Sequence, residues 1–329
     1  MPSTTSEDIV KFLISKDRTG RAVVHVRTYD RTVCKCPRRL AAGSADSLIG
    51  RVRAIYNKLG RFNHANPVSH SLVKEYLKFT RKEQASLAVT PKQAVPLFFT
   101  KYKSLIGHFR VKIAASASLS LVSKYILVRD ATFFVVDFFT GDRASDLGRL
   151  SCNQVFRLRD REGFLIRLSL TKTVRKGSPR EFVLVPFRDP DVCPVFWLDC
   201  YVRACQALGV SLSEGYFFRA SDHGKFDGER PFLGSADNNR LRVYLSEAKL
   251  CSGETPHGFR VGLSNTLSIL GCSPEEIAQY LGWKSSNMAR RYARVSHAAS
   301  TLNLLESVMP RASTVAAAVS HPANIQPIV

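Results

Sequence analysis

The sequence predicts a mainly α-helical protein, with a helical amino-terminal domain followed by an α+β domain that combines helices with one small antiparallel sheet. Its 329 residues exceed the usual length of one domain, so two domains with separate cores are favoured. Apolar residues recur at helical spacing through most of the chain, and two β-branched runs, 163–173 and 180–187, flank a basic turn with glycine and proline. The expected domains are 1–112, 113–309 and a tail over 310–329.

Short amphipathic helices make up the expected amino-terminal domain. A first helix over Ser6–Asp17 would be capped by its own first residue and carries two acidic residues in its first turn. A second helix, capped by Ser44, would bury Leu48, Val52 and Ile55. Its other face carries the basic residues Arg51, Arg53 and Lys58. Further helices are expected over 67–89 and 90–109. Any one of these charges fits an ordinary solvated face, but their sum favours a module that contacts DNA.

The second half begins with a long apolar helix that ends at Gly141. The two β-branched runs follow, and they predict a sheet of two or three antiparallel strands. Helices resume over 194–209, 237–250 and 255–295. After Pro310 the chain is rich in small residues and proline, which predicts a flexible tail or a segment that orders against a partner.

The charge of the chain is the first indication of its partner. Lysine and arginine number 48 against 27 acidic residues, a formal net charge of +21, which suits a polyphosphate such as nucleic acid. A ribosomal or simply cationic protein is the alternative. No apolar stretch is long enough to span a membrane and the start lacks the pattern of a signal peptide, so we expect a soluble, unsecreted protein without a membrane partner.

The eight cysteines are spread along the chain without a dense framework, as expected of free thiols in a reducing compartment. Cys34 and Cys36, with His25 upstream, come closest to a metal-binding pattern. A tetrahedral zinc site needs four ligands and usually a wider cysteine spacing. Two unbonded thiols are therefore favoured over a zinc site, and no metal is expected.

The stretch from Thr255 to Val295 places reactive side chains at the ends of short helices. A helix that starts near Pro256 would bring His257 and Arg260 together beside its N-terminus, where an anion is favoured. Its buried stripe would be Phe259, Leu263, Leu267 and Leu270. A capping box from Ser273 to Glu276 opens the next helix, which Gly282 closes, so Trp283 falls just past its end. Tyr292 shares a face of the last helix with Met288 and Val295.

Each of these residues has an ordinary structural explanation when it is taken alone: a first-turn cap, a surface charge, a plug at a helix end or a core aromatic. Their order, however, resembles the carboxy-terminal signature of tyrosine recombinases: His-x-x-Arg, then Leu-Gly-Trp, then tyrosine nine residues on. Many members carry histidine where Trp283 stands, and Cre recombinase is similar to this chain in having tryptophan there. The resemblance covers residues 124–296.

Two further positions of the family's motif lie upstream. The stretch "TGDRASDLGRL" resembles the family's T-G-x-R-x-x-[ED]-L and supplies Arg143 and Asp146. The stretch "LTKTVRKG" offers Lys172 for the lysine that the family carries on a β-hairpin, and Lys176 in the turn is the competing candidate.

The amino-terminal half resembles the ALOG DNA-binding domain of plant regulators, in the stretch "CKCPRRLAAGSADSLIGRVRAIYNKLG". That domain is itself similar to the amino-terminal domain of recombinases from eukaryotic mobile elements. The two resemblances together imply a recombinase of the kind carried by Cryptons or DIRS-type retroelements, and they imply a nuclear location.

The resemblance implies a chemistry without metal, cofactor or ATP. Tyr292 would attack the scissile phosphate and form a 3′-phosphotyrosine linkage. Arg143 and Arg260 would hold the phosphate, with His257 and Trp283 as further donors. Lys172 would protonate the leaving 5′-oxygen, and His257 could instead act as a base toward the tyrosine. Asp146 would orient the arginine or the histidine.

The resemblance also implies a C-shaped clamp around double-stranded DNA, dimeric on one site and tetrameric in synapsis. The residues expected to contact DNA are Arg51, Arg53, Lys58, Arg175 and Lys176. Two other functions stay open. A domesticated DNA-binding regulator would keep the clamp without the chemistry, and a type IB topoisomerase would use the same chemistry without pairing two sites.

Overall fold

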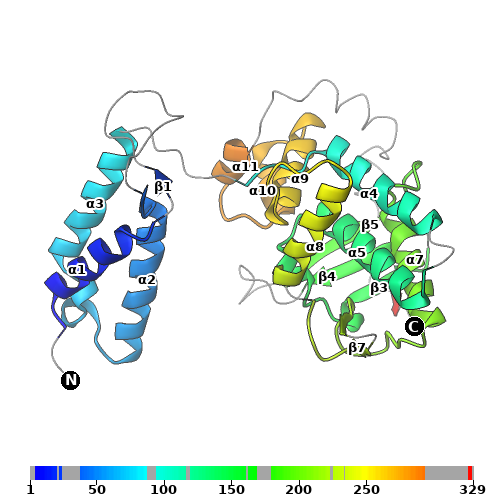
Figure 1. The fold of residues 1–329 in the computed structure, drawn as a ribbon, viewed down its shortest axis with the longest axis horizontal. Coiled ribbons are helices and arrows are strands. Elements are labelled where there is room, and N and C mark those ends of the chain that lie inside the picture. The colour runs from blue at the N-terminus through cyan, green and yellow to red at the C-terminus, as the bar shows by residue number, and fades with distance from the viewer. Residues whose placement is uncertain are drawn as a thin grey trace. The chain divides into compact units, whose positions relative to one another are not determined.

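The computed structural model divides the chain into two compact units, Met1–Gln93 and Ala94–Val329, which are described separately (Figure 1). The residues that it describes are 4–20, 22–23, 38–86, 94–115, 119–160, 162–168, 179–222, 225–232, 234–292 and 325–327. The mainly helical fold with small antiparallel sheets is as predicted.

The first unit packs three helices, α1 (Ser6–Asp17), α2 (Ala42–Lys58) and α3 (Ser71–Ser86). Two 3-10 turns, η2 (Asn63–Ala65) and η3 (Pro67–Ser69), join α2 to α3, and the short strands β1 (Ala22–Val23) and β2 (Arg38–Arg39) pair antiparallel. The core of the unit consists of apolar side chains from the helices and η3: Ile9, Leu13, Ala45, Ile49, Val68, Val73 and Leu77.

Both predicted caps of this unit were wrong. Thr5, not Ser6, caps α1, because its side chain and that of Asp8 exchange hydrogen bonds with each other's backbone. Helix α2 starts at Ala42, before Ser44, and the Ala42 N–H donates to the Gln84 side chain of α3 at 2.8 Å. A neighbouring helix therefore replaces the local cap. Ile55, expected inside, is 57% exposed.

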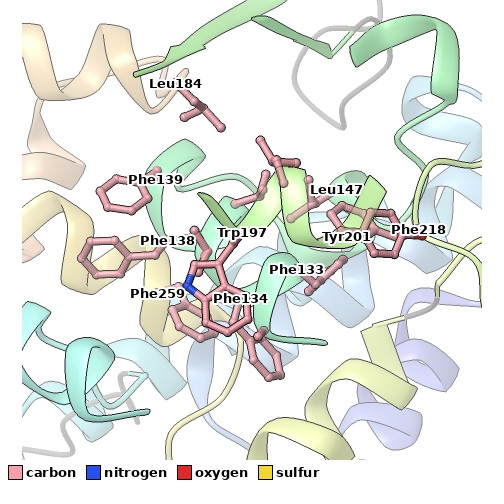
Figure 2. Close-up of a cluster of buried hydrophobic side chains, with 14 of the residues drawn as sticks. Phe133, Phe134, Phe138, Phe139, Leu147, Leu184, Trp197, Tyr201, Phe218 and Phe259 are labelled. Carbon is pink, nitrogen blue, oxygen red and sulfur yellow. The ribbon is translucent and has the colours of Figure 1, made fainter. Parts of the chain in front are cut away.

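Helix α5 (Leu121–Thr140) forms the centre of the second unit, and every residue from Arg129 to Thr140 is buried. It contacts α4 (Phe99–Ala114), α7 (Pro194–Ala207) and α9 (His257–Ile269) (Figure 1). Figure 2 shows the aromatic cluster at this centre, where Phe133, Phe134 and Phe138 of α5 lie near Trp197 of α7 and Phe259 of α9. This core holds the carboxyl end of α5 in a fixed position.

The boundary between the compact units lies earlier than residue 112, the end expected for the first domain. Helix α4 packs within the second unit, because its apolar stripe meets α5. Tyr102 of α4 stacks on Phe138 with ring centroids 4.2 Å apart. The division at Gln93 thus follows from the burial of α4 against α5.

The main sheet has four antiparallel strands in the order β5-β4-β3-β8. These are β3 (Val155–Leu158), β4 (Phe164–Leu168), β5 (Arg180–Leu184) and β8 (Ile325–Pro327). The β4 and β5 runs were predicted, and β5 begins with Arg180 opposite Leu168. Strand β8 was not predicted, because Ile325–Pro327 lies in the segment that was expected to be a flexible or partner-docking tail. In the structure this strand pairs with β3 of the same chain. A second hairpin joins β6 (Ala220–Asp222) to β7 (Lys225–Asp227).

The described part of the second unit also contains four further helices and one 3-10 turn. They are α6 (Ala144–Leu147), η4 (Cys152–Gln154), α8 (Gly234–Glu247), α10 (Pro274–Tyr280) and α11 (Asn287–Tyr292). The predicted capping box of Ser273 and Glu276 opens α10. Leu270, expected in the buried stripe of α9, is 40% exposed, because α9 has ended at Ile269.

No helix in the described part of the chain is both long and apolar enough to cross a membrane. The described cysteines, Cys152, Cys193, Cys200, Cys205, Cys251 and Cys272, are free thiols.

Candidate active site

Two turns from distant parts of the chain meet at the end of α5. The first runs from Gly141 to Arg143, and the second follows α10 through Leu281 and Gly282. Gly141 is in the left-handed region with φ of 54°, and a Cβ atom there would lie 2.4 Å from Cδ2 of Leu281. Glycine therefore permits both the turn and the close approach of the second segment.

Arg260 of α9 links the two turns. Its side chain is buried, with 2% exposed, and it donates one hydrogen bond to the Gly141 carbonyl at 2.8 Å and another to the Leu281 carbonyl. Its guanidinium also lies 5.3 Å from the ring centroid of Trp283. One buried arginine thus brings together the segment of Arg143 and the segment of Trp283.

Arg143 is the N-cap residue of α6, and about a third of its side chain (34%) is exposed. Its guanidinium Nη1 lies 3.6 Å from Oδ2 of Asp146, three residues later, which is an ion pair but longer than a hydrogen bond. Arg143 is therefore paired with a carboxylate and partly exposed, whereas Arg260 is buried.

His257 is the first residue of α9, one helical turn before Arg260. The pKa of His257 is lowered from its ordinary value by the partial burial of its ring and by the positive charges of Arg260 and Arg143. The imidazole is consequently neutral at pH 7 and lies within electrostatic reach of both arginines.

The site holds Arg143, Arg180 and Arg260 against the carboxyl groups of Asp142 and Asp146. Burial raises the pKa of the nearby Asp137 well above its usual range and favours its neutral form. Burial lowers the pKa of Arg260 to about 10, with Arg180 and Arg143 adding to the effect and Asp142 opposing it. Arg260 still carries its charge at neutral pH. An anion placed among these cations would relieve their mutual repulsion, so the electrostatics favour binding of a phosphate.

Two residues of this site were missed by the sequence analysis. Asp142 is buried between Gly141 and Arg143, and its Oδ1 accepts a hydrogen bond from Arg180 of β5 at 3.1 Å. Its proximity to Arg143 was visible in the sequence, but Arg180 was interpreted only as the first residue of a strand. No local pattern indicates that β5 reaches this turn.

The structure places part of the expected catalytic set and leaves the rest open. Lys172, Arg175 and Lys176 lie outside the described residues, as do His25, Cys34 and Cys36. Tyr292 ends α11, which packs against α9 and α10, but its side chain is outside the described part. The backbone of the expected nucleophile therefore belongs to a helix in contact with those that carry Arg260 and precede Trp283.

The expected DNA contacts of the first unit, Arg51, Arg53 and Lys58, are exposed on α2. Within the described ranges, no three histidine, cysteine or acidic side chains gather in a way that could hold a metal ion.

Comparison with known families gives two matches. The model of the "Phage integrase family" matches residues 116–299, more than half of the chain, and that of the "ALOG domain" matches residues 1–82. Both agree with the resemblances that the sequence motifs indicated.

Curated relatives match the amino-terminal part alone. Protein LIGHT-DEPENDENT SHORT HYPOCOTYLS 8 of Arabidopsis thaliana is 34% identical over 87 residues, 24% of this chain and 53% of that protein. Protein G1-like9 of Oryza sativa subsp. indica is 33% identical over 98 residues, 28% of this chain and 34% of that protein. The chain thus spans between a third and about half of the length of these relatives.

Solved structures resemble the chain over most of its length. A Tn1549 transposon integrase in complex with transposon right end DNA has a TM-score of 0.50 at 13% identity, covering 93% of this chain and 86% of that one. The XerA recombinase has a TM-score of 0.44 at 18% identity, covering 91% and 90%. At such identities the likeness concerns the fold alone.

Proposed function

Because the chain belongs to the phage integrase family, whose members are tyrosine-type site-specific recombinases, we propose that it cleaves and rejoins double-stranded DNA through a covalent bond to Tyr292. The observation that carries this proposal is the link made by Arg260, which joins the Arg143 turn to the Trp283 turn. Arg143 and Trp283 stand on segments distant in sequence from the helical turn that carries His257 and Arg260, and the contacts of Arg260 with both segments support this proposal.

Arg143 and Arg260 are the proposed ligands of the scissile phosphate. Charge builds up on the non-bridging phosphate oxygens during the reaction, and planar guanidinium forks stabilise it with paired hydrogen bonds. The excess of positive charge described above supports this role. His257 and the Trp283 indole N–H would supply further hydrogen bonds, and Asp146 would orient Arg143.

Tyr292 is the proposed nucleophile. Its phenolic oxygen attacks phosphorus and forms the 3′-phosphotyrosine bond, while the bond from phosphorus to the 5′-oxygen breaks. A base must take the phenolic proton, and the neutral His257 is suited to that task. A lysine must protonate the 5′-oxygen, for which Lys172 is proposed and Lys176 is the alternative. The attack of a 5′-hydroxyl from another strand on the phosphotyrosine reverses these steps.

The first unit is proposed to hold the duplex. Its exposed Arg51, Arg53 and Lys58 would contact the DNA backbone, together with Arg175 and Lys176 of the second unit. The match to the ALOG domain supports this role. Its plant relatives and the transposon integrase of similar fold favour an origin in a eukaryotic mobile element of the Crypton or DIRS type, and hence a nuclear location. Assembly as a dimer on one site and a tetramer in synapsis is also proposed.

A covalent-adduct assay tests this function. Half-site suicide duplexes, first selected from a random library by binding to the protein, are incubated with it in the absence of divalent metal. A denaturing gel then reveals any covalent adduct. We expect an adduct with the wild-type protein and none with Tyr292→Phe, because the variant lacks the nucleophilic oxygen but keeps the ring.

The same assay separates the alternatives. Tight binding of DNA by the wild-type protein without any adduct would overturn the proposed chemistry and favour a DNA-binding regulator. Adduct formation together with relaxation of a supercoiled plasmid, but without pairing of two duplexes, would instead indicate a type IB topoisomerase.

A further inference from the structure

Arg180 of β5 makes the same kind of link as Arg260, from the opposite side. It donates to Oδ1 of Asp142 at 3.1 Å and to the Tyr280 carbonyl at 2.8 Å. Arg260 donates to the Gly141 and Leu281 carbonyls, each one residue away from those acceptors. Two arginines, one from a helix and one from the sheet, thus join the same pair of turns.

Asp142 connects the two arginines to each other. Its Oδ1 lies 3.1 Å from Nη1 of Arg180 and 3.6 Å from Nη1 of Arg260. The carboxylate is buried, which makes it costly to ionise without positive partners. A buried charge that is paired on both sides fixes the backbone on which it stands, and the next residue on that backbone is Arg143.

Two N–H donors of Arg180 are bound to protein acceptors. Its side chain is 11% exposed, against 34% for Arg143, and Nη1 and Nη2 both donate to protein acceptors. Gly282 packs against it so closely that an added Cβ would lie 2.8 Å from Nε. With Nη1 bound to one turn and Nη2 bound to the other, Arg180 is suited to hold the two turns in place.

We propose that Arg180 is a positioning residue of the recombination reaction, which sets Arg143 and Arg260 on the scissile phosphate through Asp142 and the Tyr280 carbonyl. This inference rests on the function proposed above. The β5 strand, which no motif assigns to the site, then becomes part of the phosphate-binding machinery. Small displacements of groups that bind the reacting phosphate can cost on the order of 10²-fold in rate.

The test uses Arg180→Met, Arg180→Lys, Asp142→Asn and the double variant Arg180→Met/Asp142→Asn in the full chain. The matched control is Arg167→Met. Arg167 lies on the neighbouring strand β4 and donates to Glu181 at 2.6 Å, but it contacts neither turn. Cleavage rates are measured on suicide duplexes at saturating protein, and DNA affinity and melting temperature are measured in parallel.

We expect Arg180→Met and Asp142→Asn each to slow cleavage by on the order of 10- to 100-fold, while DNA affinity stays within a few-fold of the wild type. The double variant should be no slower than the slower single variant, because the two residues act as one unit. Arg180→Lys should recover part of the rate, and Arg167→Met should cleave at the wild-type rate.

A substrate with an uncharged methylphosphonate at the cleavage position separates positioning from a general loss of structure. Removing the phosphate charge reduces what correctly placed arginines can stabilise, so the defect of Arg180→Met should shrink on this substrate. An equal defect on both substrates, effects that multiply in the double variant, or wild-type cleavage by Arg180→Met would each overturn the inference. If the wild-type protein forms no adduct, the proposed function itself fails. This outcome is seen in the wild-type reaction and does not depend on the Arg180 variants, so the two failures can be distinguished.

Discussion

Replacing Arg260 by methionine should separate the contribution of this residue to stability from its contribution to catalysis. Burial lowers the pKa of Arg260 from 12.5 to about 10, which corresponds to roughly 3 kcal/mol against the charged side chain. Its two hydrogen bonds to buried carbonyls offset this by about 3–6 kcal/mol together. Arg260→Met removes both the cost of burying the charge and the two hydrogen bonds. The free energy of unfolding should therefore fall by only about 0–3 kcal/mol.

Cleavage should respond far more strongly than stability. Loss of one preorganised donor to the charged phosphate typically lowers a rate on the order of 10² to 10³-fold. The unfolding free energy is measured by denaturant titration, and cleavage is measured as single-turnover adduct formation. Arg219→Met is the matched control, since Arg219 is also buried and donates to two carbonyls, those of Ser211 and Glu214, yet lies outside the site.

The control should lose stability while it keeps the wild-type rate. A fall in unfolding free energy well above 3 kcal/mol for Arg260→Met, with cleavage lost only in proportion to unfolded protein, would refute the reasoning. Arg260 would then have a structural role and no direct role in the cleavage reaction.

Three further perturbations test the electrostatics and packing of the second unit. Gly141→Ala should destabilise the protein by about 1–3 kcal/mol in thermal unfolding, because φ is 54° and the new Cβ would meet a leucine at 2.4 Å. Gly209→Ala, at φ of 66° with no atom within 4 Å, should cost less, and equal losses would contradict the packing argument. Burial and the charge of Asp130 raise the pKa of Asp237 to about 8, so the folded state retains a proton that the unfolded state loses near pH 4. Stability should therefore fall as pH rises from about 4 to 8, by about 1.4 kcal/mol per pH unit for this group. Asp237→Asn should accordingly melt above the wild type at pH 8 and close to it at pH 4, whereas parallel melting curves would contradict the shift. The histidine NMR titration should give His257 a pKa below 6.5, and Arg143→Met should raise it by removing a positive charge. An unchanged value would place Arg143 too far away to act on the imidazole.

Local signals predicted those features that depend on neighbouring residues in the sequence. The capping box from Ser273 to Glu276 and the left-handed Gly141 after α5 need only a few adjacent residues, and both are present in the structure. The placement of His257 and Arg260 on one helical turn likewise depends only on neighbouring residues. The family was indicated by the order of His257, Arg260, Trp283 and Tyr292, which the match to the phage integrase family confirms.

Several of the wrong predictions depend on segments that are distant in the sequence. Ser44 is a good cap by composition, but Gln84 of another helix satisfies the start of α2 two residues earlier. Ile55 follows the helical period of the buried stripe, yet it is 57% exposed, so packing with other segments and not the period decides its burial. The tail strand Ile325–Pro327 has no distinctive composition, and its pairing with β3 comes from an open sheet edge.

The structural link that Arg260 makes, together with the phosphate-binding role proposed for it, explains why an arginine stands where the motif has one. A guanidinium carries five N–H donors spread over three nitrogens. Two of these donors reach the Gly141 and Leu281 carbonyls, which leaves three that a phosphate could engage. The donors of lysine all sit on one nitrogen, so a lysine could not reach two carbonyls of separate turns and also face the phosphate as a planar fork. The same side chain can therefore assemble the site and serve in it, and the structural link and the chemical role need not be separate features of this position.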